Sequence, residues 1–141
     1  MTIAQAIERA DALKGNSFTD AQKIQMLSDC DSAIFTDIFS THEADDDTPD
    51  EFAGYDSETD TDTVLLVGSP YDVLYIRWLH SQYDLYNQEV SRYNNTSSIY
   101  NVAYAAYSAY YNRTHLPLQS ATYFNVGGLY ETTAADATDP V

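Results

Sequence analysis

The chain is short of basic residues and has a single cysteine. Of its 141 residues, six are Lys or Arg and 22 are Asp or Glu, which gives a formal net charge of -16 at pH 7. A surface with so few cations disfavours binding to nucleic-acid phosphates or to anionic lipid. Because Cys30 is the only cysteine, no intramolecular disulfide can form, and its apolar surroundings favour a packed thiol in a reducing compartment.

Long apolar runs and known catalytic motifs are absent as well. The longest aliphatic run, residues 64–67, is far too short to span a bilayer, and the N-terminus lacks the pattern of a signal peptide. We therefore expect a soluble protein made in the cytoplasm, with no membrane partner. The sequence has no glycine-rich phosphate loop, no Cys/His metal spacing and no nucleophile elbow. Because His42, His80 and His115 lie on three separate segments, we expect no enzyme, cofactor or metal site.

Apolar residues at helical spacing predict a mainly α fold. Residues 2–14 predict a short amphipathic helix capped by Thr2, followed by a longer helix that Thr19 caps and that ends near Phe39. Asp31 interrupts the apolar stripe of this second helix, so its face is imperfect. We expect a small helical bundle built on a long antiparallel helix pair, with a short strand or β-hairpin element and an extended C-terminal arm.

The composition changes between residues 43 and 62, where ten of twenty residues are acidic. Such a segment buries too little apolar surface to offset its ordering entropy, so we expect a mobile loop inserted in the domain. A calcium site is the alternative, because acidic residues alternate from Asp56 to Asp62 as oxygen ligands can. The glycine and the closing glutamate of an EF-hand loop are missing, which favours the solvated loop.

The central stretch from Asp62 to His115 predicts a buried strand and two helices. The strand is residues 64–67, and a helix then begins at Ser69 and Pro70 and ends at Asn94-Asn95. The next helix runs to the end of the stretch. Its expected core stripe is Ile99, Ala103, Ala106 and Tyr110, beside a row of four tyrosines at positions 100, 104, 107 and 111.

Ten of the thirteen tyrosines lie in this stretch. Tyrosine has an apolar ring and a polar hydroxyl, which suits a surface that is partly buried against another protein. We expect a subunit interface here, and the alternative is that the tyrosines border a small core. The predicted interface residues are Tyr71, Tyr75, Trp78, Tyr100, Tyr104, Tyr107 and Tyr111.

The chain divides near residue 116. We expect one helical domain over residues 1–116 and an extended arm over residues 117–141, where the helical period is lost after Pro117. The centre of the arm is apolar, and such a tail often becomes ordered on a partner. The predicted partner-docking residues of the arm are Tyr123, Phe124, Val126, Leu129 and Tyr130.

The central stretch resembles the head-tail connector (adaptor) proteins of tailed bacteriophages. The matching parts are the aliphatic run VLLV, the helix start Pro70-Tyr71-Asp72, the stretch from Glu89 to Asn95, and the closing segment from Tyr111 to His115. They cover about a third of the chain closely, and they are packing and turn motifs. The long acidic insert and the 26-residue tail depart from the family's pattern.

The resemblance implies a virion protein of the phage neck, assembled in the host bacterial cytoplasm. It implies a ring of identical subunits, typically twelve-fold, that lies between the portal protein and the tail or a neck completion protein. DNA would pass through the ring without specific binding, so we expect the acidic loop to line or rim the channel. The residues expected there are Asp45, Asp46, Asp47, Asp50, Glu51, Asp60 and Asp62.

Two other functions remain open at this stage. Another phage neck or tail-completion protein would use the same kind of surface. An acidic DNA-mimic inhibitor of a nucleic-acid-binding enzyme belongs to a different class, and it would carry its carboxylates on rigid helices or strands. Here the acidic residues cluster in a predicted loop, which favours the connector.

Overall fold

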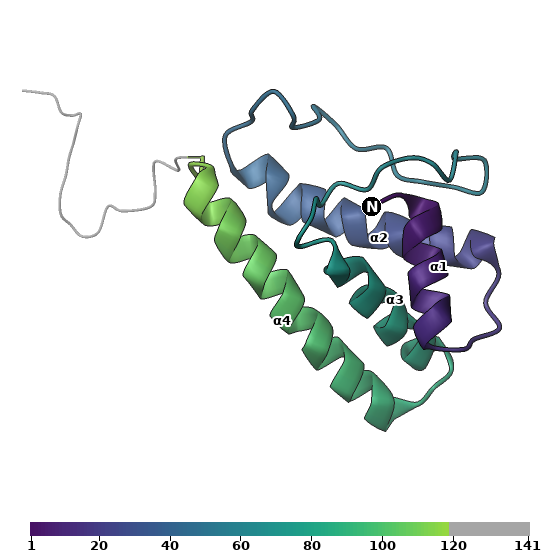
Figure 1. The fold of residues 1–141 in the computed structure, drawn as a ribbon. Helices are drawn as coiled ribbons and strands as arrows, with labels where there is room; N and C mark the ends of the chain where they lie inside the picture. The colour runs from purple at the N-terminus through teal and green to yellow at the C-terminus, as the bar shows by residue number, and fades with distance from the viewer. Residues whose placement is uncertain (119–141) are drawn as a thin grey trace, which may run out of the picture.

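A computed structural model describes residues 1–118 of the chain. In that range it contains four α-helices and one 3-10 turn: α1 (Ile3–Leu13), α2 (Asp20–Asp37), η1 (Phe39–Thr41), α3 (Val73–Tyr86) and α4 (Val90–Thr114). α3 packs against the other three helices, and α4 runs antiparallel to it along one side of the molecule (Figure 1). The prediction of a mainly helical fold built on an antiparallel helix pair is confirmed.

The first two helices begin where the sequence predicts. The hydroxyl of Thr2 accepts a hydrogen bond from the Gln5 N–H at 3.2 Å, and the Gln5 side chain accepts one from the Thr2 N–H at 3.0 Å. Thr19 and Gln22 form the same reciprocal pair at the start of α2. Each capping box satisfies two backbone donors that the helix itself leaves unpaired, which fixes the first residue of each helix.

The predicted strand at residues 64–67 is not part of a sheet. The segment is extended and lies beside the N-terminus, where the Leu65 N–H donates to the Met1 carbonyl at 3.0 Å and Val64 forms an isolated bridge with Thr2. Leu65 and Val67 are buried, as expected of the apolar run. The prediction of a strand is wrong because the N-terminal segment, its backbone partner among the described residues, turns into α1 after two residues.

The boundary between α3 and α4 also differs from the prediction. Ser69 does not cap α3, which begins only at Val73, after a turn. The two helices are joined at residues 87–89, where Gln88 has a left-handed backbone with φ of 62°. Asn94 and Asn95, the predicted helix end, lie inside α4. As a result, α4 is 25 residues long and is the longest helix among the described residues.

Residues 43–62 are anchored to α2. The buried Tyr55 donates from its hydroxyl to Asp31 at 2.6 Å, and its backbone N–H donates to the Ser28 hydroxyl at 2.9 Å. Phe52 stacks on Phe35 of α2 with 6.3 Å between ring centroids. Among the described residues this segment forms neither helix nor strand, and its two aromatic side chains supply a packing on α2 that its acidic composition did not predict. That the loop is mobile stays a prediction.

The chain after α4 pairs with the segment that follows α2. The Glu43 N–H donates to the Leu116 carbonyl at 2.8 Å, and the Leu118 N–H donates to the Thr41 carbonyl at 2.9 Å. The five predicted docking residues of the arm, from Tyr123 to Tyr130, lie outside the described residues.

Candidate docking surface

The tyrosine row of α4 faces inward. Tyr107 and Tyr111 are each 4% exposed, and Tyr111 stacks on Phe39 with 5.1 Å between ring centroids. Tyr100 packs on Trp78 of α3 at 5.1 Å. These aromatic contacts fix which face of α4 points toward α2 and α3.

Three of the predicted interface residues are instead core residues of this chain. Tyr75, Tyr107 and Tyr111 are buried, and their rings pack within the bundle. The other four are partly buried and pack against the core from its edge: Tyr71, Trp78, Tyr100 and Tyr104. The alternative that the tyrosines border a small core therefore describes most of them.

The hydroxyls of the inward tyrosines bond to buried polar groups. Tyr75 donates to the Asp31 carboxylate at 2.5 Å and accepts from the Val67 N–H at 2.8 Å. The Tyr100 hydroxyl lies 3.7 Å from the Cys30 sulfur. Burial raises the pKa of Tyr75 and of Tyr100 well above the ordinary value, and the neighbouring Asp31 and Cys30 raise these pKa values further. Both hydroxyls therefore keep their protons, and that of Tyr75 acts as a donor to Asp31.

The opposite side of α4 is apolar and open to solvent. Val102 is 70% exposed and Ile99 is 38% exposed. The outer face of α4, as we define it, comprises Ile99, Val102, Ala105, Ala106 and Ala109, all of them exposed. Our prediction placed Ile99 and Ala106 in the core stripe, and it is wrong because the tyrosine row occupies that position.

No charged residue lies on α4 between Arg92 and Arg113. Solvent-facing helix surfaces are normally rich in Lys, Glu and Arg, because charge keeps a helix face hydrated and prevents association. Here a helix of 25 residues presents small apolar and uncharged polar side chains instead. This pattern is typical of a helix face that another protein covers.

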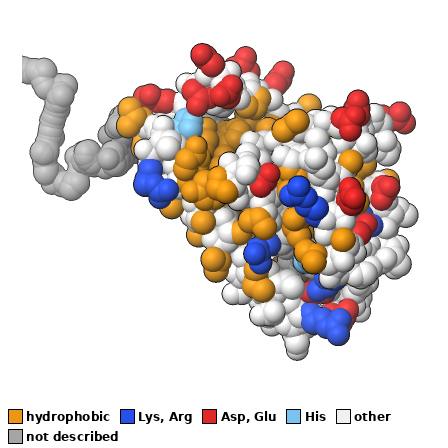
Figure 2. Space-filling view, in the orientation of Figure 1, with side chains coloured by type: hydrophobic (Ala, Val, Ile, Leu, Met, Phe, Trp, Pro, Cys, Tyr) orange, Lys and Arg blue, Asp and Glu red, His pale blue; other side chains and the backbone are white. Residues whose placement is uncertain are grey.

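The acidic side chains lie on another part of the surface. Figure 2 shows a group of them along the upper edge, where residues 43–62 run in Figure 1, and others on the right side, while apolar side chains lie over and beside α4 with some Lys and Arg among them. All of the acidic residues predicted to face a channel are exposed: Asp45, Asp46, Asp47, Asp50, Glu51, Asp60 and Asp62. Residues 43–62 thus form an acidic edge, and the outer face of α4 carries no charge.

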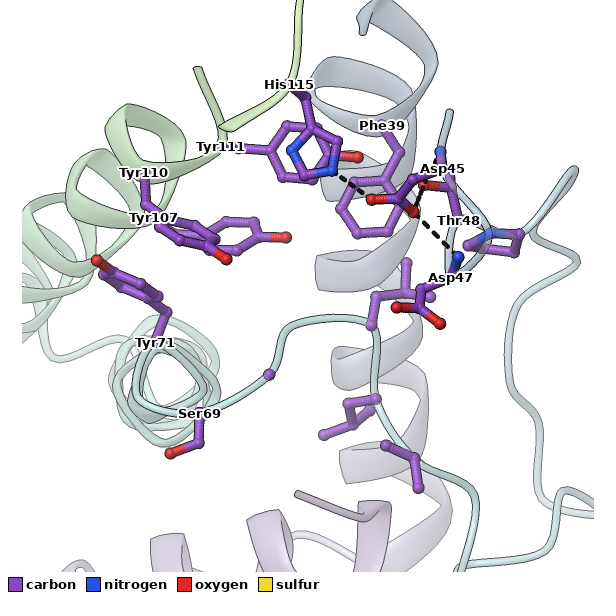
Figure 3. Close-up of a pocket in the computed structure, with 15 residues that line it drawn as sticks. Phe39, Asp45, Asp47, Thr48, Ser69, Tyr71, Tyr107, Tyr110, Tyr111 and His115 are labelled. Atoms are coloured by element: carbon purple, nitrogen blue, oxygen red, sulfur yellow. Dashed lines mark hydrogen bonds and ion pairs between the residues drawn. The ribbon is translucent and has the colours of Figure 1, made fainter. Parts of the chain in front are cut away.

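A pocket of about 530 Å³ lies between the acidic segment and the tyrosine-bearing side of α4 near its C-terminal end. One side is aromatic and comes from the turn before α3 and the end of α4, with Tyr71 stacked on Tyr110 at 4.8 Å (Figure 3). The other side is the turn that begins at Asp45. His115 closes one end by donating from Nε2 to Asp45 at 2.7 Å and by stacking on Tyr111 at 3.8 Å.

The turn at Asp45 is held by its own side chains. The Asp45 carboxylate accepts from the Thr48 hydroxyl at 2.8 Å, from His115 at 2.7 Å and from the Asp47 N–H at 3.0 Å. These hydrogen bonds, that of Thr48 first and that of His115 next, lower the pKa of Asp45 below its ordinary value. The carboxylate is therefore ionised near neutral pH and keeps the acidic wall of the pocket in place.

Two further findings concern residues 1–118. No group of three or more His, Cys, Asp or Glu side chains among the described residues could hold a metal ion, so nothing in that part of the chain supports the calcium alternative. Of the helices that the structure describes, none combines the length and the apolarity needed to cross a membrane.

No protein-family model, curated protein or solved structure matches the chain.

Sequence reasoning missed the outer face of α4 and the pocket. Val102, Ala105 and Ala109 were not singled out, because a row of tyrosines is the stronger apolar signal on the same helix. The signal that could have found this face is the absence of charge over the twenty residues between Arg92 and Arg113. The pocket could not be found from the sequence, because it joins three segments that are far apart in the chain.

Proposed function

We propose that this chain is a structural subunit of a phage virion, a head-tail connector that forms a ring between the portal and the tail or neck. The observation that carries the proposal is the uncharged outer face of α4 on a chain whose net charge is -16. Two copies that each carry this charge repel one another wherever their acidic surfaces meet. The outer face of α4 is a broad surface on which copies can approach without that repulsion.

The contact that fits this face is head-to-tail. A ring closes when one surface of a subunit binds a different surface of the next, so each subunit needs two unlike faces. The outer face of α4 supplies one of them. The acidic edge at residues 43–62 then faces the channel, where negative charge lets DNA pass without binding, and no catalytic role is required of the protein.

The proposal is tested by the mass of the assembly. Native mass spectrometry on the full chain, alone and mixed with the portal protein of the same virus, should show a closed ring in at least one of the two samples. Val102→Asp, which places a carboxylate on the outer face of α4, should weaken assembly at least tenfold, because burial of an unpaired charge is strongly unfavourable.

The matched control is Leu13→Asp. Leu13 is 74% exposed on α1, so this variant adds the same charge at a similarly exposed position outside the outer face of α4. It should assemble like the wild type. A monomer in both samples, or equal assembly by the two variants, would contradict the proposal.

A further inference from the structure

The pocket beside the acidic edge has two walls of different chemistry. Tyr71, Tyr107 and Tyr110 form the aromatic wall, with ring centroids 4.8 to 6.2 Å apart. Asp45 and Asp47 stand on the opposite wall, and in Figure 3 the Asp47 carboxylate points into the space between the walls. The pocket therefore presents aromatic rings to one side of an occupant and a carboxylate to the other.

The two carboxylates differ in what already binds them. Asp45 accepts hydrogen bonds from Thr48, His115 and the Asp47 N–H, so each of its oxygens already has a partner. Within residues 1–118, no hydrogen bond or ion pair is made by the Asp47 carboxylate. No Lys or Arg is among the described residues that line the pocket. A cation that pairs with Asp47 must therefore come from outside this part of the chain.

An organic cation with a flat face fits this combination best. The face of an aromatic ring carries negative potential and attracts cations, and a guanidinium group also stacks on it because it is planar. The same group can donate two parallel hydrogen bonds to one carboxylate. A phosphate or another anion is repelled by both walls. A metal ion lacks the three side-chain ligands it needs among the described residues.

We propose that this pocket binds an arginine side chain of a partner protein, with the guanidinium between Tyr110 and the carboxylate of Asp47. The inference rests on the proposed function only in that the occupant belongs to a neighbouring protein of the assembly. It adds the chemistry of that neighbour, which must present an exposed arginine on a segment narrow enough to enter. It also gives the acidic edge a binding role in addition to its proposed place at the channel.

The test uses the full chain and three peptides that differ at one side chain. They are Ac-Ser-Gly-Arg-Gly-Ser-amide, the same sequence with citrulline, which has nearly the shape of arginine but is neutral, and the same sequence with lysine. Saturation-transfer NMR at low salt reads the protons of the arginine side chain, and it works whether or not the protein is assembled. We expect saturable binding of the arginine peptide at millimolar concentration and none of the citrulline peptide.

Two variants distinguish specific pairing of the arginine with Asp47 from nonspecific attraction of a cationic peptide to an acidic protein. Asp47→Asn should weaken binding of the arginine peptide about tenfold, because a charge-assisted bidentate pair is lost. Asp46→Asn is the matched control: Asp46 is the adjacent acidic residue, is exposed, and does not line the pocket. Asp46→Asn should change the affinity for the arginine peptide less than twofold. Tyr110→Leu, checked for folding by circular dichroism, should weaken binding as well.

Four results would overturn the proposal. The arginine peptide could show no saturable binding up to about 20 mM, or the citrulline peptide could bind equally well. The two Asp variants could lose equal affinity for the arginine peptide, or the lysine peptide could bind equally well, which would exclude a preference for guanidinium. The ring assembly of Asp47→Asn, measured in parallel by native mass spectrometry, should match the wild type. Failure of peptide binding with intact assembly contradicts this inference alone, and failure of assembly contradicts the proposed function alone.

Discussion

At the scale of single residues, Asp31 joins three segments of the chain. Its carboxylate is fully buried in α2 and accepts hydrogen bonds from the hydroxyls of Tyr55 and Tyr75 and from the N–H of Leu66. One side chain thus ties the acidic segment, the extended segment and α3 to α2. An apolar residue of similar size would leave all three donors without an acceptor, which is why an acid can occupy a core position here.

Burial raises the pKa of Asp31 above its ordinary value of 3.8, and the hydrogen bonds from Tyr55, Tyr75 and Leu66 offset only part of this shift. A carboxyl whose pKa is higher in the folded state binds its proton more tightly there than in the unfolded chain. Its contribution to the free energy of unfolding is therefore largest below pH 3.8, falls as the pH rises toward the folded pKa, and is constant above it.

Asp31→Asn should lower the free energy of unfolding by about 1 to 3 kcal/mol at pH 7, because the amide cannot accept from all three donors. The loss relative to the wild type should be greatest near pH 4 and should shrink as the pH rises, since only the wild type carries the titrating group. Urea unfolding at several pH values from 4 to 8 measures both effects.

Asp29→Asn is the control for Asp31. Asp29 is exposed on the same helix, and its substitution should change the free energy of unfolding by less than about 0.5 kcal/mol. A loss at position 31 that grows with rising pH would contradict the direction given for the pKa.

Asp31 also shows what residue patterns can and cannot predict. The stripe on α2 correctly predicts the helix, and it predicts the buried face at Ile24, Leu27 and Ile34. Periodicity alone treats Asp31 as a flaw, because it carries no information on hydrogen-bond partners that lie 24 and 44 residues away in the chain. An acid inside an apolar stripe, in a chain with many tyrosines, is the signal that could have indicated a buried network.

At the scale of elements, helix starts were predictable where the signal is local. The caps at Thr2 and Thr19 depend on a residue three positions away, and both are found. The junction of α3 and α4 has no such signal, since neither Gly nor Pro occurs between Tyr71 and Leu116. Asn94 and Asn95 lower helix propensity only modestly, and the packing of Tyr100 on Trp78 of α3 favours continuation of the helix past them.

The turn between α3 and α4 contains a residue in a strained conformation. Gln88 has φ of 62°, in the left-handed region, where a side chain costs roughly 1 kcal/mol or more. Gln88→Gly should therefore raise the free energy of unfolding by about 0.5 to 1 kcal/mol, after the added freedom of glycine in the unfolded chain is subtracted. Thermal or urea unfolding of the purified variant measures the change.

Asn87→Gly is the matched control, one residue earlier in the same exposed turn. Asn87 has φ of -87°, which any residue adopts, so glycine gains nothing there and should lower stability by up to about 1 kcal/mol. Stabilisation by both variants, or by neither, would contradict a left-handed residue at 88.

At the scale of the whole molecule, the acidic segment and the outer face of α4 are two surfaces of different character. The acidic residues of the 43–62 segment lie along one edge, and the outer face of α4 carries no charge. This difference was only half predictable. The acidic segment is plain in the sequence. The exposed side of α4 is not, because α4 has two apolar stripes and their pattern does not show which of them packs on α3.

The difference in charge predicts opposite salt dependences for the two surfaces. Exposed charges interact over roughly 10 Å at 0.1 M salt and 3 Å at 1 M, so added salt screens the repulsion between copies that each carry a charge of -16. Association through the uncharged outer face of α4 should therefore strengthen between about 0.05 and 0.5 M NaCl, and arginine-peptide binding at Asp47 should weaken. Sedimentation velocity and peptide titration over the same salt series measure the two trends. Subunit association that weakens with salt would mean that the copies meet through ion pairs, and it would contradict the assignment of the contact to the outer face of α4.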